Sequence, residues 1–312
     1  NARNCTLTMR VPLFFILCIL IPLTFSSSLN FCSHPLVFRV IGGETTTTSD
    51  YPWQAVFFYY GNEGYGTLCG ASILNEKWLL TAAHCVLNAT SRAYVNVGIK
   101  SLSVAKKTLK IDSIYIHPRF SLTTVHNDIA LVKVKGSIAL GGDVQPVCIY
   151  KDDSSLIHNS HTALVTGFGM SASISMNTLV VKQTPSDRLL ETRLPLVDID
   201  ECRNTWKVIS GGSVSISRDT QLCAGSLMHG TGPGDSGGPL HVEDSFGRLV
   251  QVGITSFGAN GVRGLVDQAS YPGVYTRVSP YVPWIESVIN SSSSTISLSF
   301  LSPLLFAYLR SQ

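Results

Sequence analysis

Short apolar runs separated by Gly, Ser, Asn and Pro recur along the middle of the chain. They fall at residues 53–60, 77–83, 94–99, 111–116, 129–134, 163–167 and 249–255. Runs of this length between turn-forming residues predict β-strands, and a series of them predicts a sandwich or barrels. A helical pattern covers residues 279–290, where Tyr281 and Ile285 lie one turn apart on the same face. The pattern therefore predicts an all-β protein that ends in a helix.

Composition narrows the class of protein. The chain has 312 residues, of which 45% are hydrophobic and 14% are charged, and its formal net charge is +3. This length admits two domains or one larger all-β unit, and this composition favours a sizeable core over global disorder. The Lys and Arg residues are scattered instead of gathered in one basic run. Nucleic-acid binding is therefore excluded as the main function.

The N-terminal region has the pattern of a secretory signal. Arg10 is followed by the almost continuously apolar residues 11–25, and the small residues 26–28 then suit a signal peptidase. We predict a signal peptide at 9–28, an upstream segment at 1–8 and secretion. The other interpretation, a membrane anchor, is disfavoured because the apolar stretch is shorter than the roughly 18 to 20 residues of a spanning helix.

Six of the eight cysteines lie beyond this signal segment. They are Cys32, Cys69, Cys85, Cys148, Cys202 and Cys223. An even number in an oxidising compartment predicts disulfides, but spacing alone does not choose among the pairings. A zinc site is the rival interpretation, and it is disfavoured because the chain has no CxxC pair and only His84 adjoins a cysteine. We therefore expect no metal and no cofactor.

Three short motifs carry candidate catalytic residues. The first, LTAAHC, contains His84, the second, HNDIAL, contains Asp128, and the third, GDSGGP, contains Ser236. Any one of them alone is more commonly a turn or a surface segment. Together, and in this order, they resemble the chymotrypsin-like serine peptidases, and the resemblance covers residues 39–289. It implies two six-stranded antiparallel β-barrels with an active site in the cleft between them.

The residue types also suit acyl transfer. A serine hydroxyl is a weak nucleophile at neutral pH, so an imidazole must take its proton. His84 would be this base for Ser236 and would later protonate the leaving amine. Asp128 would accept a hydrogen bond from the other ring nitrogen and fix the tautomer. The backbone N–H groups of Gly234 and Ser236 would form the oxyanion hole.

The sequence RVIGG, which begins at Arg39, resembles the zymogen cleavage site of this family. Cleavage after Arg39 by a trypsin-like protease would free the amino group of Val40 to pair with Asp235, because a buried carboxylate is costly unless it is paired. This implies a propeptide at 29–39 and a peptidase domain at 40–289. The other interpretation is an ordinary loop arginine followed by a strand.

The resemblance also implies how the cysteines pair. The implied disulfides are Cys69–Cys85, Cys202–Cys223 and Cys32–Cys148, the last of which would tether the propeptide to the catalytic domain. Two disulfides common in the family are missing. Ala163 and Val242 stand at one pair of positions, and Gly232 stands at a position of the other. The second loss removes a brace from the walls of the substrate pocket.

The primary specificity is predicted from the residue six positions before the nucleophile, which forms the pocket floor in this family. Here it is Gly230, whereas an aspartate would select Arg and Lys. The other implied pocket residues are Thr231, Ser256, Phe257, Gly258 and Gly273. Burying an unpaired cation costs several kcal/mol, whereas a large apolar side chain gains roughly 1.5 to 3 kcal/mol. We predict cleavage after Phe, Tyr, Leu or Met. The other interpretation is that the loop rearranges and Asp267 restores selectivity for basic residues.

Three further segments carry weaker signals. Asn88 begins a glycosylation sequon, which accords with secretion. The polar loop at 170–188 is longer than usual in the family and is either substrate-facing or merely solvated. Residues 290–312 are Ser-rich and then apolar, a pattern similar to a glycosylphosphatidylinositol signal. The alternative for these last residues is a disordered tail of a secreted, extracellular protein.

The leading hypothesis is a secreted serine endopeptidase. Its partners would be protein or peptide substrates, the activating protease and proteinaceous inhibitors, with lipid-anchored membrane association if the tail is a signal. A non-catalytic binding protein on the same fold is a second class, and the presence of all three catalytic residue types argues against it. A structural disulfide-rich matrix protein is a third class. It is disfavoured because such a protein needs no His, Asp and Ser motifs in this order.

Overall fold

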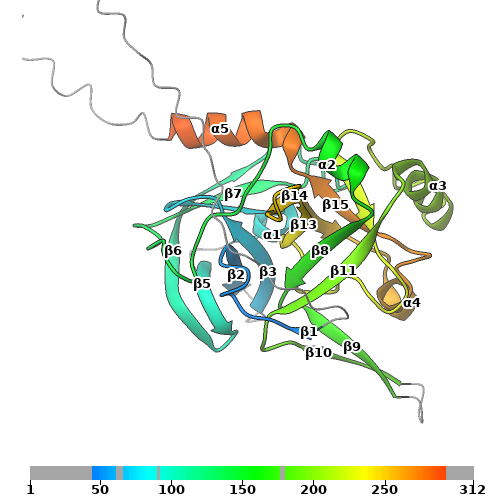
Figure 1. Cartoon of the computed structure of the whole chain (residues 1–312), viewed down its shortest axis with the longest axis horizontal. Coiled ribbons are helices and arrows are strands. Elements are labelled where there is room, and N and C mark those ends of the chain that lie inside the picture. The colour runs from blue at the N-terminus through cyan, green and yellow to red at the C-terminus, as the bar shows by residue number, and fades with distance from the viewer. Residues whose placement is uncertain (1–43, 61–65, 90–91, 176–179, 293–312) are drawn as a thin grey trace, which may run out of the picture.

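The computed structural model describes residues 44–60, 66–89, 92–175 and 180–292, which are drawn in colour in Figure 1. The predicted signal peptide, the propeptide with Arg39, Val40 and the apolar part of the C-terminal tail lie outside the described residues. Within the described ranges, no helix combines the length and the apolar character needed to cross a bilayer.

The first half of the described chain forms a closed antiparallel barrel. Its strands, in the order in which they pair, are β2 (Gln54–Tyr60), β3 (Gly66–Ile73), β4 (Trp78–Thr81), β7 (Ala130–Val134), β6 (Val104–Ile116) and β5 (Tyr94–Ser101). Each strand contributes an apolar side chain to the interior: Phe57, Ile73, Leu79, Leu131, Leu109 and Ile99. Alternate residues of a strand face opposite sides. The predicted apolar runs supply four of these six side chains, whereas Ile73 and Leu109 lie outside the predicted runs.

The second half forms another ring of strands beside the first. The order is β8 (Thr162–Gly167), β11 (Leu190–Val197), β12 (Gln221–Ala224), β15 (Gly273–Arg277), β14 (Leu249–Phe257) and β13 (Pro239–Glu243), which pairs back with β8. The short β1 (Glu44–Thr45) extends the sheet along β11. Its core includes Val165, Leu194, Leu222, Tyr275, Val252 and Leu240. Two six-stranded antiparallel barrels confirm the predicted fold class.

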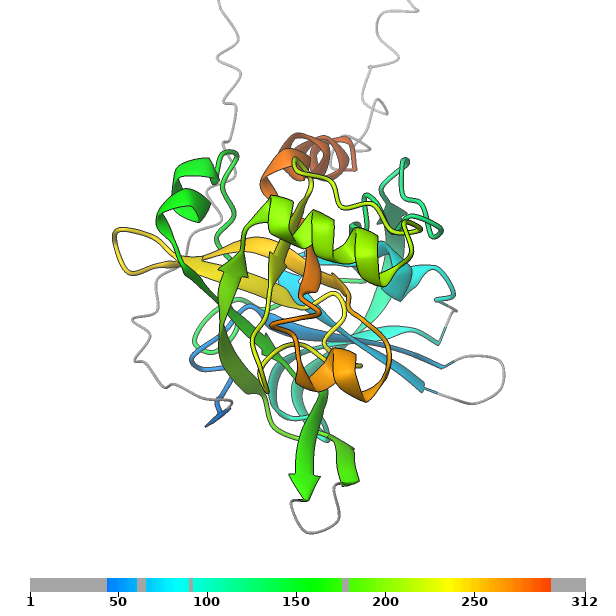
Figure 2. The ribbon, with the colours of Figure 1, turned by 90° about the vertical axis from the view of Figure 1, so that its right-hand side faces the viewer.

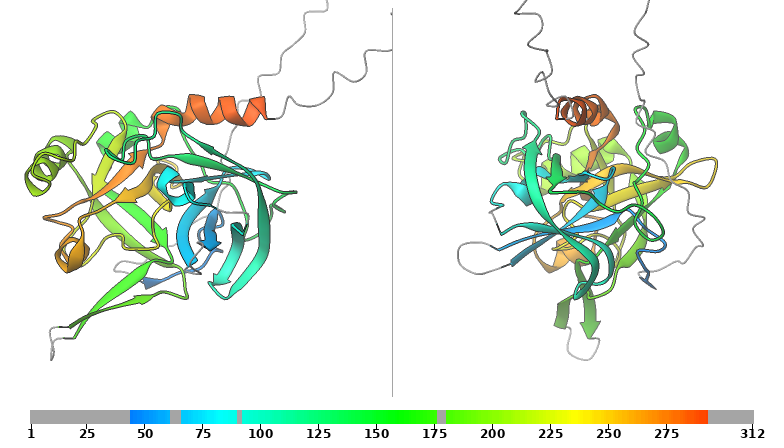
Figure 3. Two further views of the ribbon diagram at one scale, coloured as in Figure 1. Left: turned by 180° about the vertical axis from the view of Figure 1, so that it is seen from behind. Right: turned by 90° about the vertical axis from the view of Figure 1, so that its left-hand side faces the viewer.

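Most helices lie at the periphery of the barrels, whereas the single-turn helix directly after β4 lies near the middle of the molecule, as Figures 1 and 3 show. The helices are α1 (Ala83–Val86), α2 (Ser154–Asn159), α3 (Ile199–Ile209), α4 (Gly261–Val266), η1 (Ser279–Tyr281) and α5 (Val282–Ser291). The predicted C-terminal helix is therefore a 3-10 turn followed by α5, which buries Ile285 and Ile289. The rings of Tyr281 and Trp284 each lie 5.1 Å from that of His117, at the end of β6, so this helix packs against the first barrel.

The segment predicted as a polar loop at 170–188 is mostly a β-hairpin. Strands β9 (Met170–Ser175) and β10 (Val180–Pro185) pair along their whole length as a separate two-stranded sheet. The hairpin projects from the body of the molecule in Figures 1 and 2. Its sequence includes Ile174, Val180, Val181 and Thr184, β-branched residues that favour extended backbone, which explains the difference from the prediction.

Buried polar side chains join the two barrels. The three hydrogen bonds run from Trp53 Nε1 to His241 Nε2 at 2.7 Å, from Ser72 Oγ to Gln251 Oε1 at 2.6 Å and from Thr166 Oγ1 to Gln54 Oε1 at 2.7 Å. Burial lowers the pKa of His241 to about 3, so its imidazole is neutral near neutral pH. The barrels are thus held at one relative position, which fixes what lies at their junction.

Candidate active site

His84 and Asp128 form a hydrogen-bonded pair at the edge of the first barrel. His84 lies in α1 directly after β4, and Asp128 lies just before β7. The distance from His84 Nδ1 to Asp128 Oδ2 is 2.7 Å, and the backbone N–H of His84 donates to Oδ1 at 2.9 Å. The Asp128 side chain is fully buried, whereas that of His84 is 26% exposed. The carboxylate therefore holds the ring from inside, and the ring remains accessible to a reactant.

Two residues of the second barrel also hold Asp128. Ser256 Oγ donates to Asp128 Oδ2 at 2.6 Å, and Thr276 Oγ1 donates to the backbone carbonyl of Asp128 at 3.0 Å. The preceding Asn127 has a φ of 55°, a left-handed conformation that asparagine tolerates better than most residues. Its side-chain oxygen accepts from Tyr281 Oη at 3.0 Å. The position of Asp128 is thus set by both barrels.

Ser236 lies in a tight turn before β13 that packs against the first barrel. Its carbonyl oxygen accepts from the backbone N–H of Gly70, in β3, at 2.7 Å. Gly237 has a φ of 79°, and a Cβ there would lie 2.2 Å from Thr81 Oγ1. Gly234 has a φ of 97°, also in the region that favours glycine. The glycines of the motif are therefore required by backbone conformation and by close approach.

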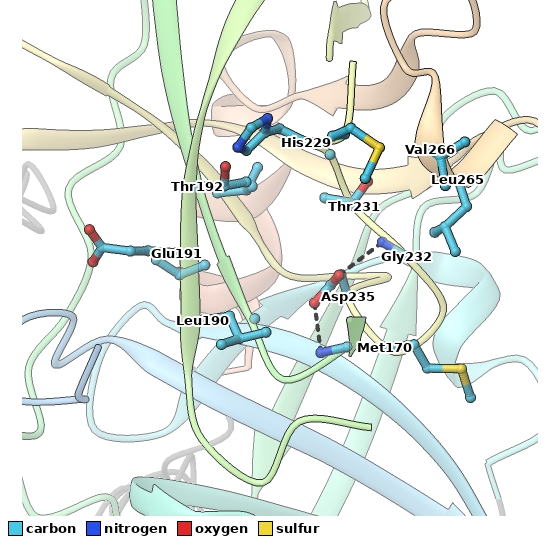
Figure 4. A pocket seen from close by; sticks show the side chains of 16 residues that line it. Met170, Leu190, Glu191, Thr192, His229, Thr231, Gly232, Asp235, Leu265 and Val266 are labelled. Carbon is cyan, nitrogen blue, oxygen red and sulfur yellow. Dashed lines mark hydrogen bonds between the residues drawn. The ribbon is translucent and has the colours of Figure 1, made fainter. Parts of the chain in front are cut away.

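The side chain of Asp235 points into a cavity of about 300 Å³, shown in Figure 4. Its Oδ1 accepts from the backbone N–H of Gly169 at 2.8 Å, and its Oδ2 accepts from that of Gly232 at 2.9 Å. Burial raises the pKa of Asp235 to about 6, although the two backbone donors act in the opposite direction. Over the described ranges, no Lys, Arg or His forms an ion pair with this carboxylate. The cavity therefore favours a cation.

A second cavity, of about 400 Å³, opens beside Ser236. The predicted pocket residues Thr231, Ser256, Phe257 and Gly258 line it, as does Ser236 itself. Ser256, which also binds Asp128, thus connects this cavity with the His84–Asp128 pair. No Asp or Glu is among its lining residues in the part of the chain that the structure describes.

The predicted floor residue, Gly230, does not line this second cavity. It lines the cavity at Asp235 instead, and a Cβ on Gly230 would lie 1.9 Å from the side-chain oxygen of Gln268. Gly273 is covered by the same side chain, since its Cβ would lie 3.3 Å from Gln268 Oε1. The side chain of Gln268 thus fills the space that the two glycines leave. Asp267 does not line the cavity, and its Oδ1 accepts from the backbone N–H of Ser270 at 3.1 Å.

The wall that contains Phe257 is braced from α3. The rings of Phe257 and Trp206 pack edge to face with centroids 5.0 Å apart, and Trp206 Nε1 donates to the carbonyl of Pro272 at 3.0 Å. The Cys202–Cys223 disulfide ties the same helix to β12. This wall is therefore held by contacts that the sequence motifs do not include.

The remaining predicted residues are placed as follows. A Cys69–Cys85 disulfide joins β3 to α1, and because its two sulfurs are bonded to each other they offer no thiolate beside His84 for a metal. Cys148 is disulfide-bonded, and Cys32, its expected partner, lies outside the described residues. Asn88 is exposed in the turn after α1, where a glycan would meet solvent.

Two closed six-stranded barrels packed side by side define the fold of the chymotrypsin-like serine peptidases. The Trypsin family model matches residues 40–285 of this chain. The match covers more than half of the sequence, and the chain therefore belongs to this family of serine-type endopeptidases.

Relatives of the chain include proteases of several animals. Ovochymase of Halocynthia roretzi is 28% identical over 264 residues, which cover 82% of this chain and 15% of its own. Serine proteinase stubble of Drosophila melanogaster is 31% identical over 276 residues, or 84% of this chain and 33% of its own. CLIP domain-containing serine protease B4 of Anopheles gambiae is 32% identical over 282 residues, or 83% of this chain and 72% of its own. The chain thus spans 15% and 33% of the first two relatives.

Proposed function

We propose that this chain is a secreted serine endopeptidase in which Ser236 is the nucleophile, His84 the general base and Asp128 the residue that orients His84. The observation that carries the proposal is the 2.7 Å pair between His84 and the buried Asp128, beside the cavity that Ser236 lines. The relatives named as serine proteases support the same reaction class.

The geometry supports an acyl-enzyme route. His84 Nε2 takes the proton of the Ser236 hydroxyl while the oxygen bonds to the peptide carbon, and the carbonyl electrons move onto the oxygen. The backbone N–H groups of Gly234 and Ser236 donate to this oxyanion. The intermediate collapses, the peptide C–N bond breaks and His84 passes its proton to the leaving amine. Water then attacks the ester by the same steps and restores the Ser236 hydroxyl.

Asp128 serves this cycle through the ring tautomer. Its Oδ2 accepts a hydrogen bond from the Nδ1–H of His84, and the unprotonated Nε2 can then act as the base. When His84 becomes an imidazolium, the adjacent carboxylate stabilises the new positive charge. Ser256 donates to the same oxygen from the second barrel, so the carboxylate cannot rotate without breaking a 2.6 Å hydrogen bond.

The enzyme is made as a zymogen in this proposal. A trypsin-like protease cuts after Arg39, and the new ammonium of Val40 pairs with Asp235. The cavity of about 300 Å³ at Asp235 and the rise of its pKa to about 6 support this pairing, since both favour a cation beside the carboxylate. The propeptide at 29–39 remains attached through Cys32–Cys148 after the cut.

Cleavage follows large apolar or aromatic residues. The cavity beside Ser236 is lined by Phe257, Ala259 and Leu265, and its described lining includes no carboxylate that could neutralise Lys or Arg. An apolar side chain gains from burial there, whereas a cation would lose its hydration without a partner. Protein or peptide substrates, the activating protease and proteinaceous inhibitors are the expected partners. In the alternative in which residues 290–312 are a glycosylphosphatidylinositol signal, a lipid anchor would hold the enzyme at the cell surface.

A fluorophosphonate reagent that reacts with activated serine hydroxyls tests the proposed mechanism. After trypsin treatment the protein should be labelled at Ser236, as located by peptide mass analysis, and the Ser236→Ala variant should not be labelled. A folded, cut protein that takes up no label would instead be the non-catalytic binding protein on the same fold.

A further inference from the structure

We propose that Gln268 forms the floor of the primary substrate pocket and selects uncharged aliphatic side chains, an inference that rests on the proposed peptidase function. The usual floor position, Gly230, is hidden behind it. Gln268 lies in the loop between α4 and β15, far along the chain from the segment that precedes Ser236. The floor residue is therefore Gln268, from the loop before β15, and not Gly230, from the segment that precedes Ser236.

The side chain of Gln268 is fixed at both polar atoms. Its Oε1 accepts from the backbone N–H of Thr231 at 3.2 Å, and its Nε2 donates to the Thr231 carbonyl at 2.7 Å. The residue is 3% exposed. A Cβ on Gly225 would lie 2.5 Å from the backbone oxygen of Gln268, so its main chain also packs closely against the end of β12. The carboxamide is thus a rigid part of the pocket.

These hydrogen bonds stand close to the position of a missing disulfide. Gly232 occupies the site where the family commonly has a cysteine, and Thr231 is its neighbour. The two bonds between Thr231 and Gln268 connect the two walls that the disulfide would have connected. Gln268 therefore does two things: it braces the pocket and it closes the lower end.

The closed lower end determines which side chains fit. The carboxamide occupies the space beside Gly230 and Gly273, so less depth is left in the cavity for the ring of a Phe or Tyr side chain. Phe257 and Leu265 line the part of the cavity that remains, and we expect the side chains of Leu and Met, which carry no ring, to fit there. A carboxamide has no charge, so Lys and Arg gain no ion pair at the floor. We therefore expect Leu and Met to be preferred over Phe and Tyr, and all four over Lys and Arg.

Two substitutions separate volume from charge at this position. Gln268→Ala removes the filling group, and the ratio of kcat/KM for Phe over Leu should rise by about tenfold or more. Gln268→Glu keeps the length and adds charge, and the ratio for Arg over Leu should rise by about 100-fold. The introduced carboxyl would be buried and one of its oxygens would face the Thr231 carbonyl oxygen. We expect these two effects to outweigh the Thr231 N–H donor and to raise the pKa of the carboxyl, so the gain for Arg should increase with pH.

The assay uses the full chain after trypsin treatment, with peptide substrates that differ only in the residue before the cleaved bond. Two rates measured on one sample share the same number of active sites, so their ratio is independent of how much of a variant folds. Labelling of Ser236 counts the sites. Asp267→Asn is the matched control, because it removes a carboxylate from the adjacent position while leaving Gln268 in place, and it should keep the ratios of the unmodified enzyme.

The outcomes distinguish this inference from the proposed function. If the unmodified enzyme prefers Arg, or if the variants that label retain its ratios, Gln268 is not the selecting residue although the peptidase mechanism stands. A shift caused by Asp267→Asn would likewise overturn the assignment. An unmodified protein that does not label at Ser236 would overturn the proposed function itself. If Gln268→Ala gives no labelled protein, the Gln268→Glu variant is the test: a kcat/KM ratio for Arg over Leu that rises with pH supports the inference, and an unchanged ratio overturns it.

Discussion

The partly buried carboxylate of Asp235, which faces a cavity, makes the activation step measurable as a pH dependence of stability. Burial raises its pKa from 3.8 to about 6 in this structure. A group whose pKa is raised on folding binds its proton more tightly in the folded state, so its effect on stability is favourable at low pH and is lost as pH rises from about 4 to about 6. The difference between 3.8 and about 6 corresponds to about 3 kcal/mol of unfolding free energy.

Cleavage after Arg39 should remove this loss. The ammonium of Val40 beside Asp235 would favour the ionised carboxylate and lower its pKa, so the cut protein should not lose stability over the same interval. Above about pH 6 the cut form should be more stable by up to about 3 kcal/mol, which is roughly 6 to 12 °C in Tm for a domain of this size.

Thermal unfolding of cut and uncut protein checks this expectation. The Ser236→Ala background prevents self-digestion, and the scans run from about pH 4 to about pH 8. Asp235→Asn is the control, because it has no charge to bury and its uncut form should lack the decrease that Asp235 causes. Parallel profiles for the cut and uncut forms would refute the pairing of Val40 with Asp235.

Three further predictions concern catalysis, processing and anchoring. Ser236→Ala and His84→Ala should each lower kcat/KM by several orders of magnitude, and the double variant should be little worse, because the two residues act as a unit; additive losses would contradict this. Arg39→Gln should remain a single chain of low activity after trypsin treatment. On a non-reducing gel, the normal cut protein should keep its propeptide attached. Release of the propeptide without reductant would exclude the pairing of Cys32 with Cys148. If residues 290–312 are an anchor signal, phosphatidylinositol-specific phospholipase should release the enzyme from cell surfaces, whereas secreted protein that retains these residues intact would exclude the anchor.

The sequence revealed those features that short segments encode. The apolar runs predicted β2, β4, β5, β6, β7, β8 and β14 because the alternation of a strand is local, whereas the runs did not include β3, β11, β12, β13 or β15. The motifs around His84, Asp128 and Ser236 each place one reactive group in a short stretch. The filling of the pocket could not be predicted in this way. Gln268 has no motif around it, and its role depends on how the loop between α4 and β15 folds back onto Thr231. Only the three-dimensional arrangement shows that this side chain covers Gly230.

The two cavities share one short segment of chain, and this connects activation with specificity. Thr231 and Gly232 line both of them. The N–H of Gly232 donates to Asp235, while both backbone polar groups of Thr231 bind the carboxamide of Gln268. Gly232, which donates to Asp235, is thus the immediate neighbour of Thr231, which binds the carboxamide of Gln268. An ion pair between the Val40 ammonium and Asp235 would therefore act on both Gly232 and the adjacent residue that binds Gln268, so we expect one cut after Arg39 to affect the catalytic turn and the substrate pocket together.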